Sequence, residues 1–324
     1  MERYTQSEDL SQIAQATALI NPVSSNSERG RRRLERLKSS SAFAINTVCT
    51  SSDPTETKEI IRNSLEQSDL LLVVAGDGTF NSVVRTILNN NLSSDAKQTP
   101  IWSLGGGNAE DGTKATHTHF TRRHPEKALN SGRIVSTYPI CFEVTKPDRS
   151  SELYAAAFYA TLGLSALLAS GEYLNQEHHR TSLLGRVALT RSISELTLSL
   201  RGLGAADLNA VMTEDGPKVF FDEGFINSHL MAKYLHFPTS LTKPEVFHYL
   251  VERRRNLLSY IPSSIFDGFP DGEYLGRDDN LTFSTTHNIY AQFDGEAETI
   301  PAQSRVNVFI HDQPLRLVVS NPLL

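Results

Sequence analysis

Residues 69–79 read DLLLVVAGDGT and decide the expected fold of the chain. The apolar run Leu70–Val74 has the length of a strand, and such runs are typical of parallel strands that are covered on both faces. The run leads into the loop Ala75–Thr79, and a helix-like segment begins at Phe80. We therefore predict a buried strand, a glycine loop at its carboxyl end and a helix after the loop.

Strand-like and helix-like segments alternate on both sides of this stretch. The expected strands are Ala16–Ile20, Ala42–Val48, Asp69–Val74 and Pro100–Leu104, and the expected helices are Ser27–Ser39, Thr55–Gln67 and Phe80–Asn89. Strands and helices that alternate at this spacing form right-handed βαβ units. The first third of the chain is therefore predicted to be an α/β domain with an open parallel sheet.

The pattern changes near Asn130–Arg133, where apolar and polar residues begin to alternate. Such alternation indicates antiparallel strands. The strands expected from it are Ile134–Val144, Asn280–Phe293 and Arg305–Val319, and helices are expected at Leu183–Leu198 and Lys243–Leu258. We therefore place an α/β N-terminal domain at residues 1–131 and a mainly antiparallel β domain at residues 132–324.

The composition argues against several classes of protein. The chain has 324 residues and a formal net charge of −6, which disfavours nucleic acid as a partner. Its two cysteines form no Cys-x-x-Cys motif. The N-terminus has no apolar signal core, and no apolar run approaches the roughly 18 residues of a membrane-spanning helix. We expect a cytoplasmic protein that is not transmembrane and meets a membrane only from its surface. The oligomeric state is left open.

The glycine loop Ala75–Thr79 has two interpretations. Gly76 and Gly78 would let the backbone approach a bulky anion, and the N-terminus of the following helix favours phosphate. Asp77, at the carboxyl edge of the strand, could position a metal–phosphate group or take a proton. In the alternative interpretation the loop is an Asp-Gly turn in which Thr79 caps the helix. No Gly-Lys-Ser/Thr follows, so the loop is not a Walker P-loop.

A second glycine loop favours the first interpretation. Gly105–Gly107 follow an expected strand. Three consecutive glycines carry an entropic cost on folding, and an ordinary turn between two elements does not need them. Two glycine loops at neighbouring strand ends could close around one triphosphate. Asn21-Pro22, at the end of the first expected strand, would add a third edge, although by itself it is also an ordinary turn.

Four motifs in the chain resemble, in the same order, the catalytic domain of diacylglycerol kinases and sphingosine kinases. These motifs are Asn21–Ser24, Ala75–Val84, Leu104–Asn108 and Asp294–Glu296. The resemblance implies a nucleotide-binding α/β domain packed against a β-sandwich-like lipid-substrate domain. It places the active cleft between the two domains.

The resemblance also implies roles for individual residues. Those expected to bind ATP are Asn21, Pro22, Ser24, Ser25, Thr50, Gly76, Asp77, Gly78, Thr79, Asn81, Gly105, Gly106, Gly107 and Asn108. Asp77, Asp294 and Glu296 are the expected catalytic residues, because a positioned carboxylate can take the proton of a hydroxyl. Mg²⁺ is expected to bridge the phosphates. We identify no counterpart of the Asp-Asp-Gly loop that holds a structural metal in some bacterial members.

The function implied is ATP-dependent phosphorylation of a lipid hydroxyl, on a diacylglycerol or a sphingoid base at a membrane surface. Three positions depart from the family pattern, since Ala75 replaces a glycine, Ser82 a glutamate and Gly106 a threonine. These departures motivate the alternative of a non-catalytic lipid- or nucleotide-binding protein with the same fold. A relative of NAD kinase is a further alternative, although the Asn-Glu pair which that family uses does not follow the second glycine loop.

Three segments keep two interpretations each. Asp294–Glu296 is locally a good hairpin turn as well as a candidate catalytic motif. The apolar stretch Tyr154–Leu168 would line an acyl pocket or form the core of the second domain. The basic stretch His178–Arg191 would contact anionic lipid or be a solvated helix face.

Overall fold

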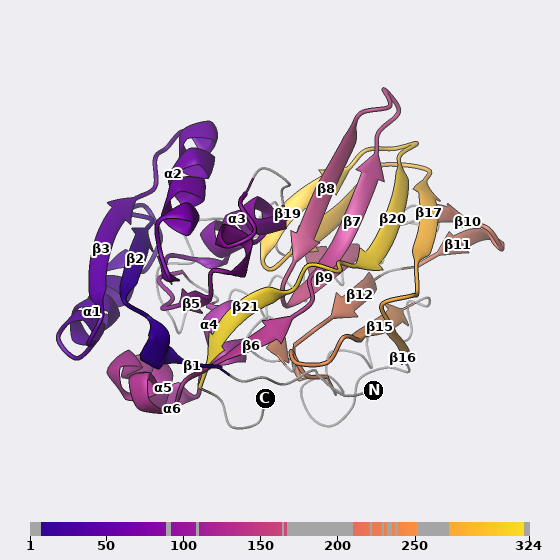
Figure 1. The fold of residues 1–324 in the computed structure, drawn as a ribbon. Helices are drawn as coiled ribbons and strands as arrows, with labels where there is room; N and C mark the ends of the chain where they lie inside the picture. The colour runs from indigo at the N-terminus through magenta and orange to yellow at the C-terminus, as the bar shows by residue number, and fades with distance from the viewer. Residues whose placement is uncertain are drawn as a thin grey trace.

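A computed structural model shows an α/β domain followed by two packed antiparallel sheets (Figure 1). It describes residues 8–88, 92–107, 110–163, 165–166, 210–220, 222–228, 230–231, 235–236, 239–251 and 272–320. The expected architecture, an α/β domain with a mostly parallel sheet and then a mainly antiparallel domain, is confirmed.

The sheet of the first domain has seven strands in the order β1-β6-β21-β5-β4-β2-β3. Their bounds are β1 (Glu8–Asp9), β2 (Gln15–Ile20), β3 (Ala44–Cys49), β4 (Leu70–Val74), β5 (Ile101–Ser103), β6 (Arg133–Thr137) and β21 (Leu315–Val319). Strands β3, β2, β4, β5 and β21 run parallel, whereas β6 and β1 are antiparallel at one edge. Every residue of β4 is buried, as its unbroken apolar run predicted.

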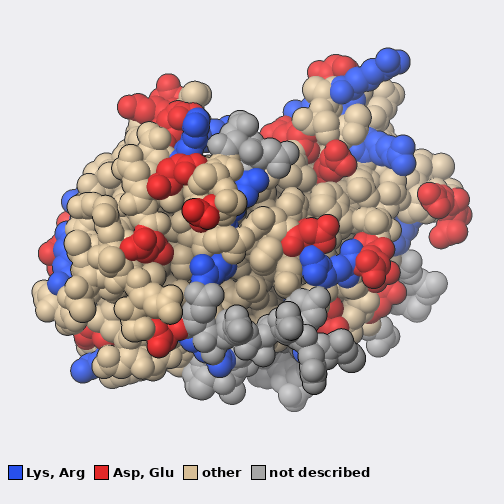
Figure 2. Space-filling view, viewed as in Figure 1, with Lys and Arg blue, Asp and Glu red and all other residues tan. Residues whose placement is uncertain are grey.

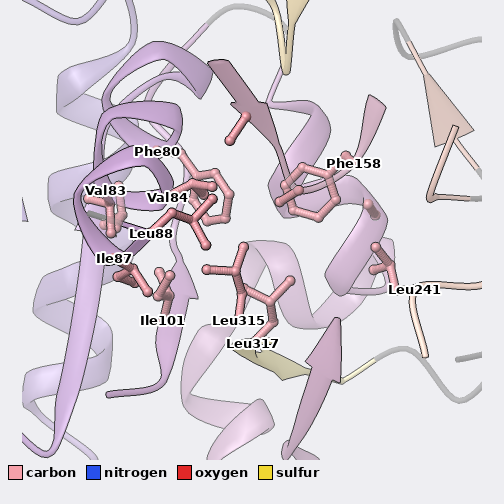
Figure 3. Packing of buried hydrophobic residues seen from close by; sticks show 14 of the residues in the cluster. Phe80, Val83, Val84, Ile87, Leu88, Ile101, Phe158, Leu241, Leu315 and Leu317 are labelled. Carbon is pink, nitrogen blue, oxygen red and sulfur yellow. The ribbon is translucent and has the colours of Figure 1, made fainter. Parts of the chain in front are cut away.

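Helices cover both faces of this sheet. They are α1 (Ser27–Lys38), α2 (Pro54–Glu66), α3 (Asp77–Leu88), α4 (Asp111–Thr116), α5 (His119–Arg123) and α6 (Ala128–Ser131), with 3-10 turns at Leu10–Gln12, Ala96–Gln98 and Pro125–Lys127. Leu34 and Leu37 of α1 pack on one face with Trp102 of β5. Helices α2 and α3 pack on the other face (Figure 3).

Local sequence explains how α2 begins. Asp53 precedes the helix with extended backbone, and its Oδ1 accepts hydrogen bonds from the backbone N–H groups of Thr55 at 2.7 Å and Glu56 at 3.4 Å. Pro54 occupies the first helical position, where a missing N–H group costs nothing. An N-cap of this kind stabilises a helix by about 1 kcal/mol.

Two six-stranded antiparallel sheets form the second domain. The first consists, in spatial order, of β11 (Gly216–Val219), β10 (Ala210–Thr213), β17 (Leu281–Thr285), β20 (Arg305–Ile310), β7 (Ile140–Thr145) and β8 (Ser151–Ala156). The second consists of β16 (Gly272–Leu275), β15 (Val246–Val251), β12 (Asp222–Ile226), β9 (Tyr159–Gly163), β18 (Ile289–Phe293) and β19 (Glu296–Ile300). Strands β13 (Leu230–Met231) and β14 (Leu235–His236) form a separate pair.

An aromatic cluster fills the space between these two sheets. The ring of Phe142 on β7 meets those of Phe225 on β12 and Phe293 on β18 edge to face, at centroid distances of 5.3 and 5.1 Å. All three side chains are at most 2% exposed. Aromatic pairs in this geometry contribute beyond their buried area, so this cluster holds the sandwich together.

The two domains share chain segments and a core. Strand β21, near the end of the described chain, lies inside the first sheet between β5 and β6. The expected boundary near residue 131 falls just before β6, so the first sheet takes in strands from beyond that point. Phe80 of α3 also stacks on Phe158, which precedes β9, at a centroid distance of 5.2 Å (Figure 3).

Three expected strands each divide into two. The runs Ile134–Val144, Asn280–Phe293 and Arg305–Val319 give β6 and β7, β17 and β18, and β20 and β21. The members of each pair lie in different sheets. Helix α3 begins at Asp77 rather than at Phe80.

The expected helix Lys243–Leu258 is wrong in the part that the structure describes. Val246–Val251 forms strand β15, paired with β12 and β16. Phe247 and Tyr249 face the core shared with the first domain, whereas Val246 faces the sandwich interior. Both faces are apolar, so the sequence lacks the alternation that marks a half-buried strand. The expected helix Leu183–Leu198 and the basic stretch His178–Arg191 lie outside the described residues.

Across the residues that the structure describes, no helix is both long enough and apolar enough to cross a membrane. Acidic and basic side chains are interspersed over the face shown in Figure 2. The upper outline in that view has a notch between α2 and the hairpin of β7 and β8.

Because the domains share a core, we expect them to unfold together. Phe142→Ala removes a fully buried ring from the second domain and should lower the free energy of unfolding by roughly 3–5 kcal/mol. The loss should be visible in the fluorescence of Trp102, the single tryptophan, which lies in the first domain. Chemical denaturation followed by Trp102 fluorescence measures it.

The matched control is Phe120→Ala, because Phe120 on α5 is 59% exposed. Its truncation should change the free energy of unfolding by no more than about 0.5 kcal/mol. If Phe142→Ala leaves the Trp102 transition where it is in the unsubstituted protein, the domains unfold independently and the expectation is wrong.

Candidate active site

Four loops lie at one edge of the first sheet, because the carboxyl ends of parallel strands meet there. Strands β2, β3, β4 and β5 end at Ile20, Cys49, Val74 and Ser103. The backbone N–H of Asn21 donates to the carbonyl of Val74 at 3.2 Å, and that of Thr50 donates to Ile20 at 2.9 Å. The strand-end residues predicted to bind nucleotide therefore share one rim.

The first glycine loop runs directly into α3. The helix begins at Asp77, so Thr79 lies inside it and does not cap it. The alternative interpretation of Thr79 as an N-cap is therefore wrong. The side-chain amide of Asn21 donates to the Thr79 hydroxyl at 3.0 Å, which joins the first loop to the helix. Pro22, beside Asn21, is exposed.

The second glycine loop is held from the side of α1. The Ser24 hydroxyl donates to the carbonyl of Gly106 at 2.8 Å, and the Asn26 side chain donates to that of Gly107 at 3.0 Å. The backbone N–H of Asn26 also donates to Gly106, at 2.8 Å. Ser25 is exposed between them. Asn108 lies outside the described residues.

The glycines of the two loops are explained by contacts within the protein. A Cβ on Gly107 would lie 2.5 Å from the Cα of Gly76, so the two loops touch backbone to backbone. A Cβ on Gly78 would collide with the carboxylate of Glu296. Gly105, at φ +73°, has no room for a side chain beside Arg33. The glycines therefore meet a packing requirement within the protein, beside the predicted approach of an anion.

Asp294 and Gly295 form the tight turn between β18 and β19. Both have positive φ, 50° and 94°, which is the backbone conformation of a two-residue hairpin turn with Asp-Gly at its centre. The local reading of this motif as a turn is therefore confirmed. The turn also brings its residues to the first domain, because a Cβ on Gly295 would lie 3.5 Å from the Cβ of Asp77.

The carboxylate of Asp294 is fully engaged inside the protein. Its Oδ1 accepts backbone N–H groups from Phe158 at 2.8 Å and Tyr159 at 3.1 Å, and its Oδ2 accepts that of Ala157 at 2.7 Å. Asn81 of α3 adds a side-chain hydrogen bond to the same carboxylate. Burial raises the pKa of Asp294 to about 6, and the hydrogen bonds partly oppose that rise.

Glu296 lies over the start of α3. Its carboxylate contacts Gly78, and the side chain remains open to solvent on one side. This packing desolvates the carboxylate and raises its pKa above the ordinary value, and repulsion by Glu298 raises it further. Asp77 is oriented nearby, since its Oδ1 accepts the backbone N–H of Gly112 at 3.4 Å.

Sequence reasoning missed two features of this site. Arg85 on α3 pairs with Glu152 of β8 at 3.1 Å and with Glu298 of β19 at 3.7 Å, which fastens the helix to both sheets. Asn81 was expected to bind nucleotide, but its amide donates to the carbonyl of Ala155 at 2.6 Å and it contacts Asp294. Only its place one turn after Asp77 on the helix could have suggested a role in positioning.

No group of three or more acidic, histidine or cysteine side chains with metal-binding geometry occurs among the residues that the structure describes. Magnesium sites that include phosphate oxygens need only one or two carboxylates from the protein. Asp77, at the start of α3, is a carboxylate that could serve in such a site.

Comparisons with known proteins support this picture. The sequence profile of the family described as diacylglycerol kinase catalytic domain matches residues 15–137. A diacylglycerol kinase structure from Bacillus anthracis str. Sterne aligns at a TM-score of 0.62 and 10% identity, over 97% of this chain and 99% of that chain. Yeast NADH kinase in complex with NADH aligns at a TM-score of 0.51 and 10% identity, over 96% and 85%. No curated protein sequence matches the chain at a significant level.

The matched segment contains the loops at Asn21, Gly76 and Gly105, whereas the Asp294 turn lies beyond it. The low identities to the solved structures mean that these establish the fold alone. The profile match and the order of the loops confirm the resemblance of residues 15–137 to the diacylglycerol kinase catalytic domain family.

Proposed function

We propose that this protein is an ATP-dependent lipid kinase that phosphorylates a hydroxyl of a diacylglycerol or sphingoid-base type lipid at a membrane surface. One observation carries the proposal. The hairpin of β18 and β19 brings Glu296 onto Gly78, at the N-terminus of α3, where Asp77 also lies. Two acidic residues from distant parts of the chain thus lie at a helix end suited to phosphate.

The nucleotide would lie along the rim of strand ends. The N-terminal turn of α3 offers backbone N–H groups and the positive end of the helix dipole to the phosphates. Asn21, held by its bond to Thr79, would contact the phosphates or the sugar from β2. Thr50, beside Ile20, would lie at the far end of the same rim.

The residues present fit Mg²⁺. Asp77 is a hard oxygen donor at the start of α3, and a magnesium site shared with phosphate oxygens needs only one or two carboxylates from the protein. When bound, Mg²⁺ neutralises phosphate charge as the phosphoryl group moves. The protein contributes the Asp77 carboxylate and the fixed geometry of the helix end.

Asp294 is assigned a positioning role. Its two oxygens already accept three backbone N–H groups and the Asn81 amide, which uses about all four lone-pair sites of a carboxylate. It is also only 2% exposed. Glu296 is open to solvent and has a raised pKa, so we propose Glu296 as the base.

The proposed reaction is a direct transfer of the γ-phosphoryl group from ATP to the lipid hydroxyl. Glu296 takes the proton of the lipid hydroxyl, and the hydroxyl oxygen forms a bond to the γ-phosphorus of ATP. The bond from that phosphorus to the oxygen bridging the β- and γ-phosphates breaks, and ADP leaves with that electron pair. A base whose pKa lies above that of an ordinary carboxylate is better suited to this transfer.

Purified protein supplied with ATP and Mg²⁺ should transfer labelled phosphate to at least one member of a lipid panel. The panel should contain diacylglycerol, monoacylglycerol, ceramide and sphingosine, with NAD⁺ and NADH added because yeast NADH kinase shares the fold. Asp77→Asn should lower kcat on the order of 10²-fold or more, because Asp77 lies where charge is reorganised.

Asp95→Asn is the matched control, since Asp95 is an exposed carboxylate before a 3-10 turn whose N–H groups it does not cap. Its kcat should equal that of the unsubstituted protein. Thermal unfolding should show both variants folded. Transfer to none of the lipids, with ATP binding intact, would leave a non-catalytic binding protein, and transfer only to NAD⁺ or NADH would replace the lipid assignment.

The pH dependence of kcat/KM should identify the base. Glu296 must be ionised to accept a proton, so kcat/KM should fall as pH drops through its raised pKa. Glu298→Gln removes the like charge that raises this pKa, so the acid limb should move to lower pH. Glu296→Gln should lower kcat far more than it weakens ATP binding.

The control for both substitutions is Glu214→Gln, an exposed residue between β10 and β11. It should leave the profile unchanged. Two outcomes would show that Glu296 is not the base. In one, the fall of kcat/KM at low pH occurs at the same pH in Glu298→Gln as in the unsubstituted protein. In the other, the same fall is still present in Glu296→Gln.

A further inference from the structure

A pocket of about 820 Å³ lies between α1, α4 and α5, apart from the proposed catalytic carboxylates. Of the 13 described residues that line it, seven are arginine or lysine and two are glutamate. The whole chain, by contrast, has a formal net charge of −6. Such a concentration of positive charge in a hollow favours anions.

The acidic side chains do not cancel this charge. Glu110 is buried and forms a two-pronged ion pair with Arg33, with N–O distances of 3.0 and 3.2 Å. Arg29 lies 3.7 Å from the same carboxylate. Within the described part of the chain, Arg32, Arg122 and Arg123 form no ion pair with an acidic side chain.

The arginines affect one another. Arg122 is half-buried, and desolvation is the main cause that lowers its pKa. Attraction to Glu110 opposes this shift, and repulsion by Arg33 and Arg123 adds to it. On the neighbouring turn, the charges of Arg33 and Arg122 help to lower the pKa of buried His117 to about 3, although burial is the main cause. These shifts are those expected around a site of positive potential that an anion would relieve.

Two further features suit the pocket to phosphate. Ser25–Ser27, at the N-terminus of α1, form part of its wall, so the positive end of that helix dipole adds to the arginine charge. Arginine also presents planar pairs of N–H donors that match phosphate oxygens. A volume of about 820 Å³ accommodates a ligand with several phosphate groups.

The pocket is separate from the proposed nucleotide rim. None of Asp77, Asp294 and Glu296 lines it, and of the described residues predicted to bind ATP only Ser25 does. The Gly105–Gly107 loop lies against both regions, because Gly105 contacts Arg33 and Glu110, whereas Gly107 contacts Gly76. The same loop is bonded to Ser24 and Asn26.

We infer that this pocket is a second anion site, which binds a phosphate-rich ligand through Arg32, Arg122 and their neighbours. The phosphates would belong either to a soluble polyphosphorylated compound or to the headgroup of a lipid. Because the pocket wall is hydrogen-bonded to the loop that touches Gly76, occupancy of the two sites is coupled, and each ligand changes the affinity for the other.

The test is calorimetric titration of tripolyphosphate into protein already saturated with ATP and excess Mg²⁺, without lipid. About one equivalent of tripolyphosphate should bind in addition to the ATP. The double variant Arg32→Gln/Arg122→Gln should weaken this binding roughly tenfold or more, since two charge-assisted hydrogen-bonding groups are lost. Binding should also weaken with added salt.

A second arm replaces tripolyphosphate with sedimentation of vesicles that contain phosphatidylcholine alone or mixed with phosphatidic acid. Binding that depends on Arg32 and Arg122 in the tripolyphosphate arm supports a soluble ligand. The same dependence only with phosphatidic acid vesicles supports a lipid headgroup. Both readouts measure binding, so a failure of the proposed kinase activity leaves them unaffected.

The matched control is Arg62→Gln/Arg305→Gln, which changes the net charge equally at exposed positions on α2 and β20. It should bind both probes as the unsubstituted protein does. The inference is overturned if neither probe binds, if the two double variants lose binding equally, or if ATP excludes tripolyphosphate so that the pocket is part of the nucleotide site. Thermal unfolding confirms that each variant is folded.

Discussion

The buried carboxylate of Asp294 is the interaction on which the candidate site depends. It gathers the backbone N–H groups of Ala157, Phe158 and Tyr159 and the side chain of Asn81, so it joins the β18–β19 turn to the start of β9 and to α3. The pKa of about 6 shows that burial outweighs these bonds. Because the folded pKa is raised, the carboxyl group favours folding most at low pH, and this contribution is lost as pH rises through about 6. The chain thus retains an ionised buried group at neutral pH at a cost in stability, which is reasonable where the group fixes the position of Glu296.

The sequence predicted the parts of the fold that local patterns determine. The unbroken apolar run at Leu70–Val74 indicated a central strand, and four loops at strand ends had to share one edge once the strands were parallel. It did not predict that β21 lies beside β5, because the choice of a distant partner strand leaves no local mark. Strand β15 was predicted to be a helix. Both of its faces are buried, so apolar and polar residues do not alternate along it.

In the candidate site, too, the sequence showed the local motifs but did not show which distant segments come together. The Asp-Gly-Glu motif was visible in the sequence. Its interpretation as a hairpin turn is confirmed, and this turn carries Glu296 to Gly78, whereas its catalytic role stays a prediction. The basic character of α1 was equally visible. The convergence of α1 with Arg122 and Arg123 was not visible, since α5 follows three strands later in the chain and no pattern determines how it packs.

Gly106 and Ala75, two of the three departures from the family pattern, lie against each other. A Cβ on Gly106 would lie 3.3 Å from the backbone nitrogen of Ala75. Gly106 also has φ +146°, a conformation that side-chain-bearing residues rarely adopt. A threonine at this position would therefore strain the loop and press on Ala75. The loss of the family's hydroxyl at 106 is thus tied to a particular path of the second glycine loop, in which Gly107 meets Gly76 and Arg33 reaches the carbonyl of Leu104 at 2.7 Å. Gly106 and Ala75 fit the path that this loop takes, so these two residues are a weaker argument for lost activity than they are in the sequence alone.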